Sequence, residues 1–180
     1  MTATILTPAA AGRSPADTPD GAAVTVTVRP LDPGERDLVE RFYAALSPGS
    51  RYLRFLQAVG PALPEPLLRQ LLDSDGVGRV TLGAFVGEEC AGIASYAVLD
   101  SQPDAAEVSV AVAEAHRRRG VARLLVDALA QRAAAHGIGA LVCLVQPGNR
   151  AALRLLRSLG VVPVLAGGLL EGRRLLLPPA

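Results

Sequence analysis

The chain has 180 residues, a length that suits one domain with a substantial hydrophobic core. Half of its residues are hydrophobic and only 19% are charged, a balance that excludes an intrinsically disordered protein. The formal net charge is +1 and aromatic residues make up 3%, so the composition gives no basis for binding nucleic acid or a membrane surface.

The N-terminal segment differs in composition from the rest of the chain. Residues 1–22 are mostly small residues and proline with little periodicity, and we expect a mobile tail ahead of one domain over residues 23–180. No apolar segment reaches membrane-spanning length, and the start lacks the layout of a secretory signal. Cys90 and Cys143 lie in apolar runs, which predicts buried free thiols in a cytoplasmic protein, and no zinc-binding spacing is present.

The first regular elements follow the tail. Val24, Val26 and Val28 alternate with polar residues and predict a strand. A helix should follow, because Asp32 offers an N-cap, Pro33 suits the first helical position, and Glu35 stands where a capping box places its carboxylate.

The next segment, residues 47–55, reads Ser-Pro-Gly-Ser-Arg-Tyr-Leu-Arg-Phe and places two aromatic residues close to two arginines. The simplest interpretation is a short helix whose Tyr52 and Phe55 pack on the core. The elements expected after it are a helix over residues 64–73, a hairpin of strands over 80–86 and 90–99, and a polar loop over 100–105.

The most informative stretch runs from Glu107 to Leu125. Its first part, residues 107–113, alternates as a strand, whereas the apolar residues from Val121 onward follow a helical period. The basic turn Arg117-Arg118-Arg119-Gly120-Val121-Ala122 joins the two patterns. A helix N-terminus has unpaired N–H groups and partial positive charge, so this turn suits a phosphate group; the alternative is a tight turn with solvated arginines.

The C-terminal part continues the alternation of strands and helices. Residues 140–145 form an apolar run typical of a buried strand. Asn149 can cap a last helix, which Gly160 should end, and two closing strands are expected over residues 161–165 and 169–177.

The spacing Arg117-x-x-Gly120-x-Ala122 between a strand and a helix resembles the acyl-CoA signature of the GCN5-related N-acetyltransferases (GNAT superfamily). The order of elements over residues 23–178 resembles the same family, and Asn149-x-x-Ala152 resembles its second CoA-binding segment. The Ser-x-x-Ser-x-Tyr-x-Arg-Phe segment is similar to the GNAT domain of bacterial protein-lysine acetyltransferases.

This resemblance implies an α/β fold with a mixed sheet of about seven strands, flanking helices and a splayed central strand pair. It implies acetyl-CoA as co-substrate, and no metal. The residues that it assigns to acetyl-CoA binding are Val110, Val112, Arg117, Arg118, Arg119, Gly120, Val121, Ala122 and Asn149.

The resemblance also implies the chemistry. A lysine amine with a pKa of about 10.4 must lose its proton before it attacks a thioester, and the family places a general base at the position of Glu107. The alternative is a solvated or ion-paired glutamate at a strand end. Glu114 lies nearer the turn, and we expect it to be solvated beside the arginines. Backbone groups of residues 110–113, Val112 foremost, would polarise the thioester carbonyl.

One expected group is missing. Many members of the family place a tyrosine as general acid seven residues after the asparagine, and here that position is Leu156. The CoA thiolate can leave without a dedicated acid, since a thiol pKa of about 8.5 permits it. A covalent route through Cys143 is conceivable, but its apolar surroundings favour a structural role.

The sequence therefore predicts a cytoplasmic N-acetyltransferase that acts on an amine, a protein lysine first of all. Two alternatives stay open: an acyl-CoA-binding sensor without activity, which the missing tyrosine favours, and an acetyltransferase for a small amine or an antibiotic. The oligomeric state also stays open, a homodimer included.

Overall fold

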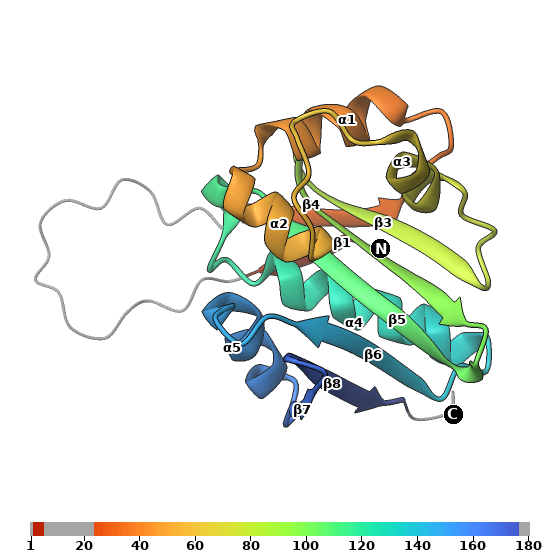
Figure 1. Ribbon diagram of the computed structural model, residues 1–180. Helices are drawn as coiled ribbons and strands as arrows, with labels where there is room; N and C mark the ends of the chain where they lie inside the picture. Colours follow the sequence, from red (N-terminus) through yellow and green to blue (C-terminus); the bar gives the residue numbers. More distant parts are fainter. Residues whose placement is uncertain (1, 6–23, 177–180) are drawn as a thin grey trace, which may run out of the picture.

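The computed structural model describes residues 2–5 and 24–176 (Figure 1). Within this part, eight strands form one sheet in the order β1-β2-β3-β4-β5-β6-β8-β7. The strands are β1 (Thr2–Ile5), β2 (Val24–Pro30), β3 (Arg79–Val86), β4 (Glu89–Leu99), β5 (Gln102–Val112), β6 (Ala140–Val145), β7 (Val164–Ala166) and β8 (Leu169–Leu175). The helices are α1 (Arg36–Ala45), α2 (Pro48–Phe55), α3 (Glu65–Leu72), α4 (Val121–Ala135) and α5 (Arg150–Ser158), with a short 3₁₀ turn over Glu114–His116.

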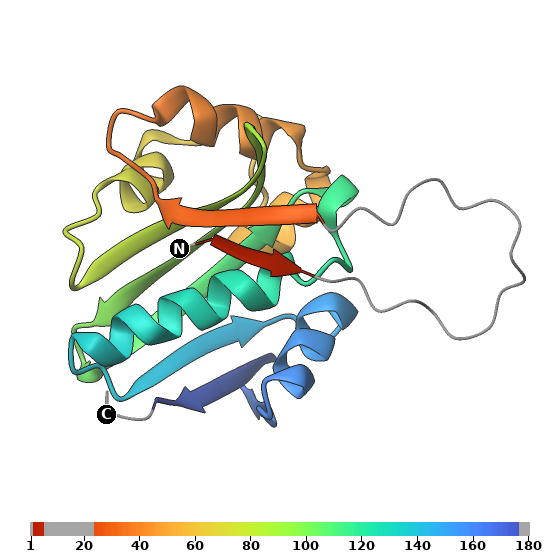
Figure 2. The same cartoon turned by 180° about the vertical axis from the view of Figure 1, so that it is seen from behind.

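Helices cover both faces of the sheet. Helices α1, α2 and α3 lie on one face, and α4 crosses the opposite face, as the two views show (Figures 1 and 2). One apolar cluster joins α4 to the sheet through Leu125 and Leu129, which are fully buried. A second cluster joins α1 and α3 to the other face through Val39 and Leu68. The mixed α/β architecture predicted from the sequence is confirmed, with a sheet that carries one strand more than the seven expected.

Helix α4 packs closely on the sheet at Gly92. A Cβ atom built at this position would lie 3.0 Å from the Ala111 carbonyl oxygen and 3.1 and 3.2 Å from side-chain atoms of Leu125 and Val121. The absence of a side chain at Gly92 therefore lets the first turns of α4 approach β4 and β5.

Strands β5 and β6 form the one parallel pair of the sheet, and they separate early. Their pairing covers only Ala105–Ala140, Ala106–Leu141 and Glu107–Val142. Beyond Glu107, β5 continues to Val112 paired only with its antiparallel partner β4. Beyond Val142, β6 is paired only with β8. This separation is the splayed central pair expected from the sequence.

Several boundaries differ from the sequence predictions, and one is that β7 begins at Val164 instead of residue 161. Residues 2–5, assigned to the tail, form β1 and pair antiparallel with β2, whereas residues 6–23 lie outside the described part. Helix α1 begins at Arg36 with Glu35 as its N-cap, so residues 33–34 form a turn and not its first helical turn. The bond expected of a capping box is present, since the Glu35 carboxylate accepts the Asp32 backbone N–H (2.8 Å). The expected loop over 100–105 is short, since Gln102 already pairs with Leu99.

Candidate active site

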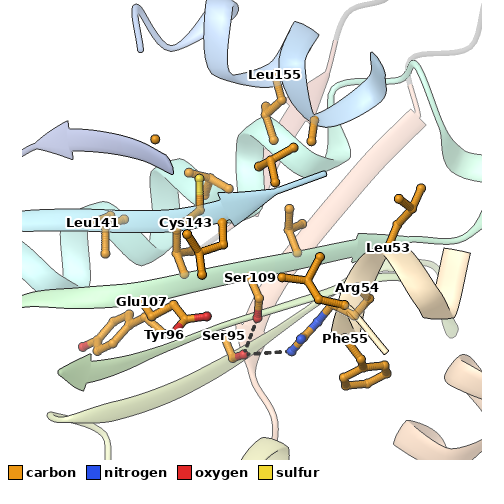
Figure 3. Close-up of a pocket in the computed structure, with 18 of the residues that line it drawn as sticks. Leu53, Arg54, Phe55, Ser95, Tyr96, Glu107, Ser109, Leu141, Cys143 and Leu155 are labelled. Atoms are coloured by element: carbon orange, nitrogen blue, oxygen red, sulfur yellow. Dashed lines mark hydrogen bonds between the residues drawn. The ribbon is translucent and has the colours of Figure 1, made fainter. Parts of the chain in front are cut away.

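The separation of β5 from β6 opens a cavity of about 480 Å³. Its walls come from α2 and α3, from strands β3 to β6, and from α5, so it extends from the α2–α3 face of the sheet to the gap between β5 and β6 (Figure 3). Residues 108–112 of β5 have no partner strand on the β6 side, so their backbone groups on that side are available to a ligand, apart from the Val112 carbonyl, which accepts a bond from Arg117.

Three of the residues predicted for the site line this cavity: Glu107, Val110 and Asn149. The other predicted residues, Val112 and the run from Arg117 to Ala122, lie outside its walls. They form the end of β5 and the turn that enters α4. The predicted residues thus occupy two connected places, the cavity and the turn beside it.

Glu107 stands at the last paired position of β5, where the two strands part. Its side chain is exposed, and among the residues that line the cavity it is the one carboxylate (Figure 3). Within the described part of the chain, it forms no ion pair and accepts no side-chain hydrogen bond. The alternative of an ion-paired glutamate is therefore not what the structure shows, and the carboxylate is open to a ligand.

The turn before α4 has the backbone of an anion-binding loop. Arg118 and Gly120 have positive φ angles of 60° and 81°, and Gly120 is the N-cap of α4. Among the described residues, no acceptor is found for the N–H groups of residues 118–123, and the first helical bond runs from the Leu124 N–H to the Gly120 carbonyl (3.0 Å). These donors and the helix dipole point to a phosphate site.

The three arginines of the turn do not share one role. Arg117 is exposed, but its guanidinium is occupied by groups of the protein: Nη2 donates to Ser50 Oγ (2.7 Å) and to Glu114 Oε1 (3.0 Å), and Nε donates to the Val112 carbonyl (3.3 Å). Arg118 and Arg119 are exposed and form no ion pair with any described residue. Only these two are therefore free to approach a phosphate.

Glu114, expected to be solvated, instead joins the turn to α2. Its Oε1 accepts hydrogen bonds from the Ser50 hydroxyl (2.6 Å), from the Ser47 hydroxyl (3.0 Å) and from the Ser47 N–H (3.3 Å). Burial raises the pKa of this carboxyl, but the bonds from Ser50 and Ser47 outweigh burial and lower the pKa to about 2. We call Ser47, Ser50, Glu114 and Arg117 the α2–turn network.

Sequence reasoning missed this network, although a signal was present. Ser47 and Ser50 stand three residues apart, which is the spacing of a helix N-cap and its first turn, and the Ser47 side chain does accept the Ser50 N–H. The spacing placed both hydroxyls on one side of α2. It did not reveal the partner, because Glu114 lies 64 residues further along the chain.

Asn149 has the capping role predicted for it. Its Oδ1 accepts the Ala152 N–H (3.1 Å) at the start of α5, and its side chain also lines the cavity. Gly160 follows the helix with a φ of 73°, as expected for a residue that ends it.

No tyrosine takes the place of the missing acid on α5. Leu156 is a residue of α5, and its side chain is buried. Tyr96 donates its hydroxyl to the Val77 carbonyl (2.9 Å), and Tyr43 is fully buried. Tyr52 lies on α2 and is half exposed, so the prediction that it packs on the core is wrong; its oxygen accepts a long bond from Gln146 Nε2 (3.4 Å).

The two cysteines are free thiols, as predicted, but both are half-buried and not fully buried as expected. Cys143 lines the cavity, and burial raises its pKa, with the negative charges of Glu107 and Glu171 acting in the same direction. Burial also raises the pKa of Cys90, to about 11. Since the thiolate is the nucleophilic form, Cys143 is poorly suited to attack at neutral pH.

Two kinds of feature are absent from the described residues. Their helices include none with the length and apolar character needed to cross a bilayer. Their histidine, cysteine and acidic side chains do not gather in a group of three that could hold a metal ion.

Comparison with known proteins agrees with this geometry. The model of the acetyltransferase (GNAT) family matches residues 40–161. Acetyltransferase PA5475 of Pseudomonas aeruginosa is 30% identical over 141 residues, covering 76% of this chain and 75% of the relative. The crystal structure of the GNAT domain of S. lividans PAT has a TM-score of 0.80 at 28% identity and covers 84% of this chain and 91% of that one. YncA of Salmonella typhimurium, a putative acetyltransferase solved with acetyl-CoA, shares the fold with a TM-score of 0.64 at 22% identity, over 86% and 96% of the two chains.

Proposed function

Because the chain belongs to the acetyltransferase (GNAT) family and is an acetyl-CoA-dependent enzyme, we propose that it acetylates a primary amine, with Glu107 as general base and protein lysine as acceptor. The observation that carries the proposal is the position of Glu107, an unpaired carboxylate in the cavity at the point where β5 and β6 separate.

Acetyl-CoA would extend from the turn into the gap between the strands. Its diphosphate suits the free N–H groups at the start of α4, with Arg118 and Arg119 nearby. Its pantetheine arm suits the unpaired backbone of β5 beyond Glu107, where amide groups can bind the arm as a partner strand would. This arrangement brings the thioester to the cavity wall near Val110.

The reaction would proceed by direct attack. Glu107 accepts a proton from the ammonium form of the acceptor, and the neutral nitrogen forms a bond to the thioester carbonyl carbon. The carbon–sulfur bond then breaks, its electron pair stays on sulfur, and the amide nitrogen loses its second proton to water. Because a free amine has a pKa of about 10.4, removal of the first proton is the step that Glu107 accelerates at neutral pH.

The thiolate would leave without a tyrosine acid. Leu156 carries no proton to donate, and Tyr96 and Tyr43 are engaged or buried. A thiol pKa of about 8.5 makes the thiolate a good enough leaving group near neutral pH. The same missing tyrosine favours the alternative of a sensor that binds acetyl-CoA without turnover.

The proposal that the acceptor is a protein lysine is supported by α2. The segment over residues 47–55 resembles that of protein-lysine acetyltransferases, and its residues Leu53, Arg54 and Phe55 form the wall of the cavity opposite β6 (Figure 3). The exposure of Glu107 lets a long side chain reach it from solvent. A lysine side chain is thin and extended, which suits such an approach.

The experiment is a CoA-release assay with acetyl-CoA, a set of lysine peptides and a set of small amines, together with calorimetry of CoA binding. Release that depends on a lysine peptide supports the proposal. Release with small amines alone would move the acceptor to that class, and tight binding without release from any amine would establish the sensor. The chain contains no lysine, so every acetyl-lysine found belongs to the acceptor.

A further inference from the structure

Arg54 lies in the cavity with most of its hydrogen-bonding capacity unused. Its Nε is buried and has no hydrogen-bond partner among the described residues. Its Nη2 makes one long contact, 3.4 Å, with Ser95 Oγ, and its guanidinium lies 4.7 Å from the centre of the Phe55 ring (Figure 3). No ion pair to Arg54 is found within the described ranges.

Arg51, one turn earlier on the same helix, shows how a structural arginine is satisfied here. It is buried, and its Nη1 donates to the carbonyl groups at the end of α1, those of Leu46, Tyr43 and Ala44, while Nε donates to the Val59 carbonyl (3.1 Å). Arg54 has no such set of acceptors: besides Ser95, it lies near the buried Tyr43 hydroxyl, where its positive charge opposes the burial that raises the Tyr43 pKa, but its Nε makes no hydrogen bond to that oxygen. Because burying an unpaired donor is unfavourable, a guanidinium in this state is ready to bind an anion that enters the cavity.

The shape of the cavity limits where that anion can be. Ser95, the contact of Arg54, pairs with Ser109 of β5, and their hydroxyls lie 3.0 Å apart. Glu107 is two residues from Ser109 and on the same face of the strand, which is a separation of roughly 7 Å along β5. The cavity therefore offers a carboxylate for an ammonium group and, a short distance away, a guanidinium for a carboxylate.

We propose that Arg54 binds a carboxylate that the acceptor carries close in space to its reacting amine, so that Arg54 determines acceptor specificity. Arginine suits this task because its planar fork matches a carboxylate with two parallel hydrogen bonds. The inference rests on the proposed acetyl transfer and narrows its acceptor. Two sources share the chemistry: an acidic residue next to the acceptor lysine of a protein, or the carboxylate of a free amino acid.

The test compares Michaelis constants for matched acceptors. One arm uses a peptide with the sequence Lys-Asp, its Lys-Asn counterpart, and a Lys-Asn peptide with the aspartate moved ten residues away to keep the net charge. The other arm uses free lysine and lysinamide. Each is measured with the wild type, with Arg54→Met, with Arg54→Lys, and with Arg41→Met, which removes an exposed arginine outside the cavity. Thermal midpoints report folding.

In at least one pair of acceptors, we expect KM for the acceptor with the carboxylate to be about 10- to 100-fold lower than for the acceptor without it. This factor corresponds to the usual contribution of a charge-assisted hydrogen bond. Arg54→Met should bring the ratio close to one, Arg54→Lys should keep part of it, and Arg41→Met should leave it unchanged. The arm that shows the preference identifies the source of the carboxylate.

A ratio of one in both arms for the wild type would overturn the inference, as would a ratio that survives in Arg54→Met. If Arg54 has only a structural role, Arg54→Met would instead lower the thermal midpoint and raise KM for all acceptors by the same factor. If no amine is acetylated, the proposed function fails. Calorimetry of the same acceptor pairs in the presence of CoA then tests the role of Arg54 without turnover. The ratio of the two dissociation constants in a pair should equal the ratio expected for KM.

Discussion

Glu107 links the fold to the proposed chemistry at the scale of a single side chain. It sits at the last residue of β5 that pairs with β6, so the strands hold its backbone while its carboxylate stays in the open cavity. A fixed backbone with an unpaired carboxylate is what a general base requires, because the proton has to pass to a group that no other cation occupies.

We expect Glu107→Gln to lower turnover at neutral pH by about 10²- to 10⁴-fold, the usual contribution of a general base, with CoA affinity nearly unchanged. The loss should shrink as pH rises toward the pKa of the acceptor amine, because more of the amine is then already neutral. The measurement is the pH–rate profile of both proteins with one lysine peptide. Profiles of the same shape and height would remove the base assignment.

The hydrogen bonds of Glu114 predict how the stability of the protein depends on pH. Its pKa falls from the ordinary value of 4.5 to about 2 in the folded protein. Its contribution to stability is therefore present above about pH 4.5 and is lost as pH falls toward 2.

The thermal midpoint of Glu114→Gln should consequently lie below that of the wild type at pH 7, and the gap should narrow between pH 4.5 and pH 3. Glu88→Gln, which changes an exposed glutamate of the β3–β4 turn, is the control and should show no such gap. A gap that stays constant down to pH 3 would mean that the α2–turn network does not depend on the charge of Glu114.

The turn that ends at Gly120 and the first turn of α4 together carry the N–H groups proposed to bind the diphosphate of acetyl-CoA. Gly120 is its N-cap with a φ of 81°, a conformation that costs a residue with a side chain about 1–2 kcal/mol. A substitution there therefore has two effects, backbone strain and interference with the phosphate, and the two must be measured separately.

Gly120→Ala adds the strain alone, whereas Gly120→Asp adds the strain and a carboxylate that competes for the N–H groups of the first helical turn. We expect Gly120→Asp to lose no more stability than Gly120→Ala, since aspartate tolerates a positive φ better and can cap the helix. Gly120→Asp should nevertheless lose roughly a further 10- to 100-fold in CoA affinity by calorimetry. Equal affinities for the two variants would mean that the diphosphate binds elsewhere.

Local patterns in the sequence predicted most elements, because each carries its own period and caps. The alternation at Val24, Val26 and Val28 and the cap at Asn149 are confirmed in place. The site is less predictable, because its decisive contacts join distant segments. Arg117 was expected at the phosphate but binds Ser50, 67 residues away, and Arg54 reaches Ser95 across 41 residues. No local pattern encodes such partners.

The molecule as a whole brings two surfaces together. Helix α2 contributes the wall with Arg54, the splayed strands contribute Glu107 and the gap, and the start of α4 contributes the free N–H groups. The α2–turn network fixes α2 to the turn, so the wall proposed to contact the acceptor and the turn proposed to bind acetyl-CoA keep a fixed relative position. We propose that both substrates occupy this cleft together and react directly.

Initial-rate kinetics with acetyl-CoA and a lysine peptide test that claim most directly. We expect double-reciprocal lines that intersect, as a ternary complex requires, and unchanged rates for Cys143→Ser. The chain contains no lysine, so radiolabelled acetyl-CoA without acceptor should leave the side chains of the protein unlabelled. Parallel lines, together with an acetyl group on Cys143, would contradict direct transfer and would place a covalent intermediate on the enzyme.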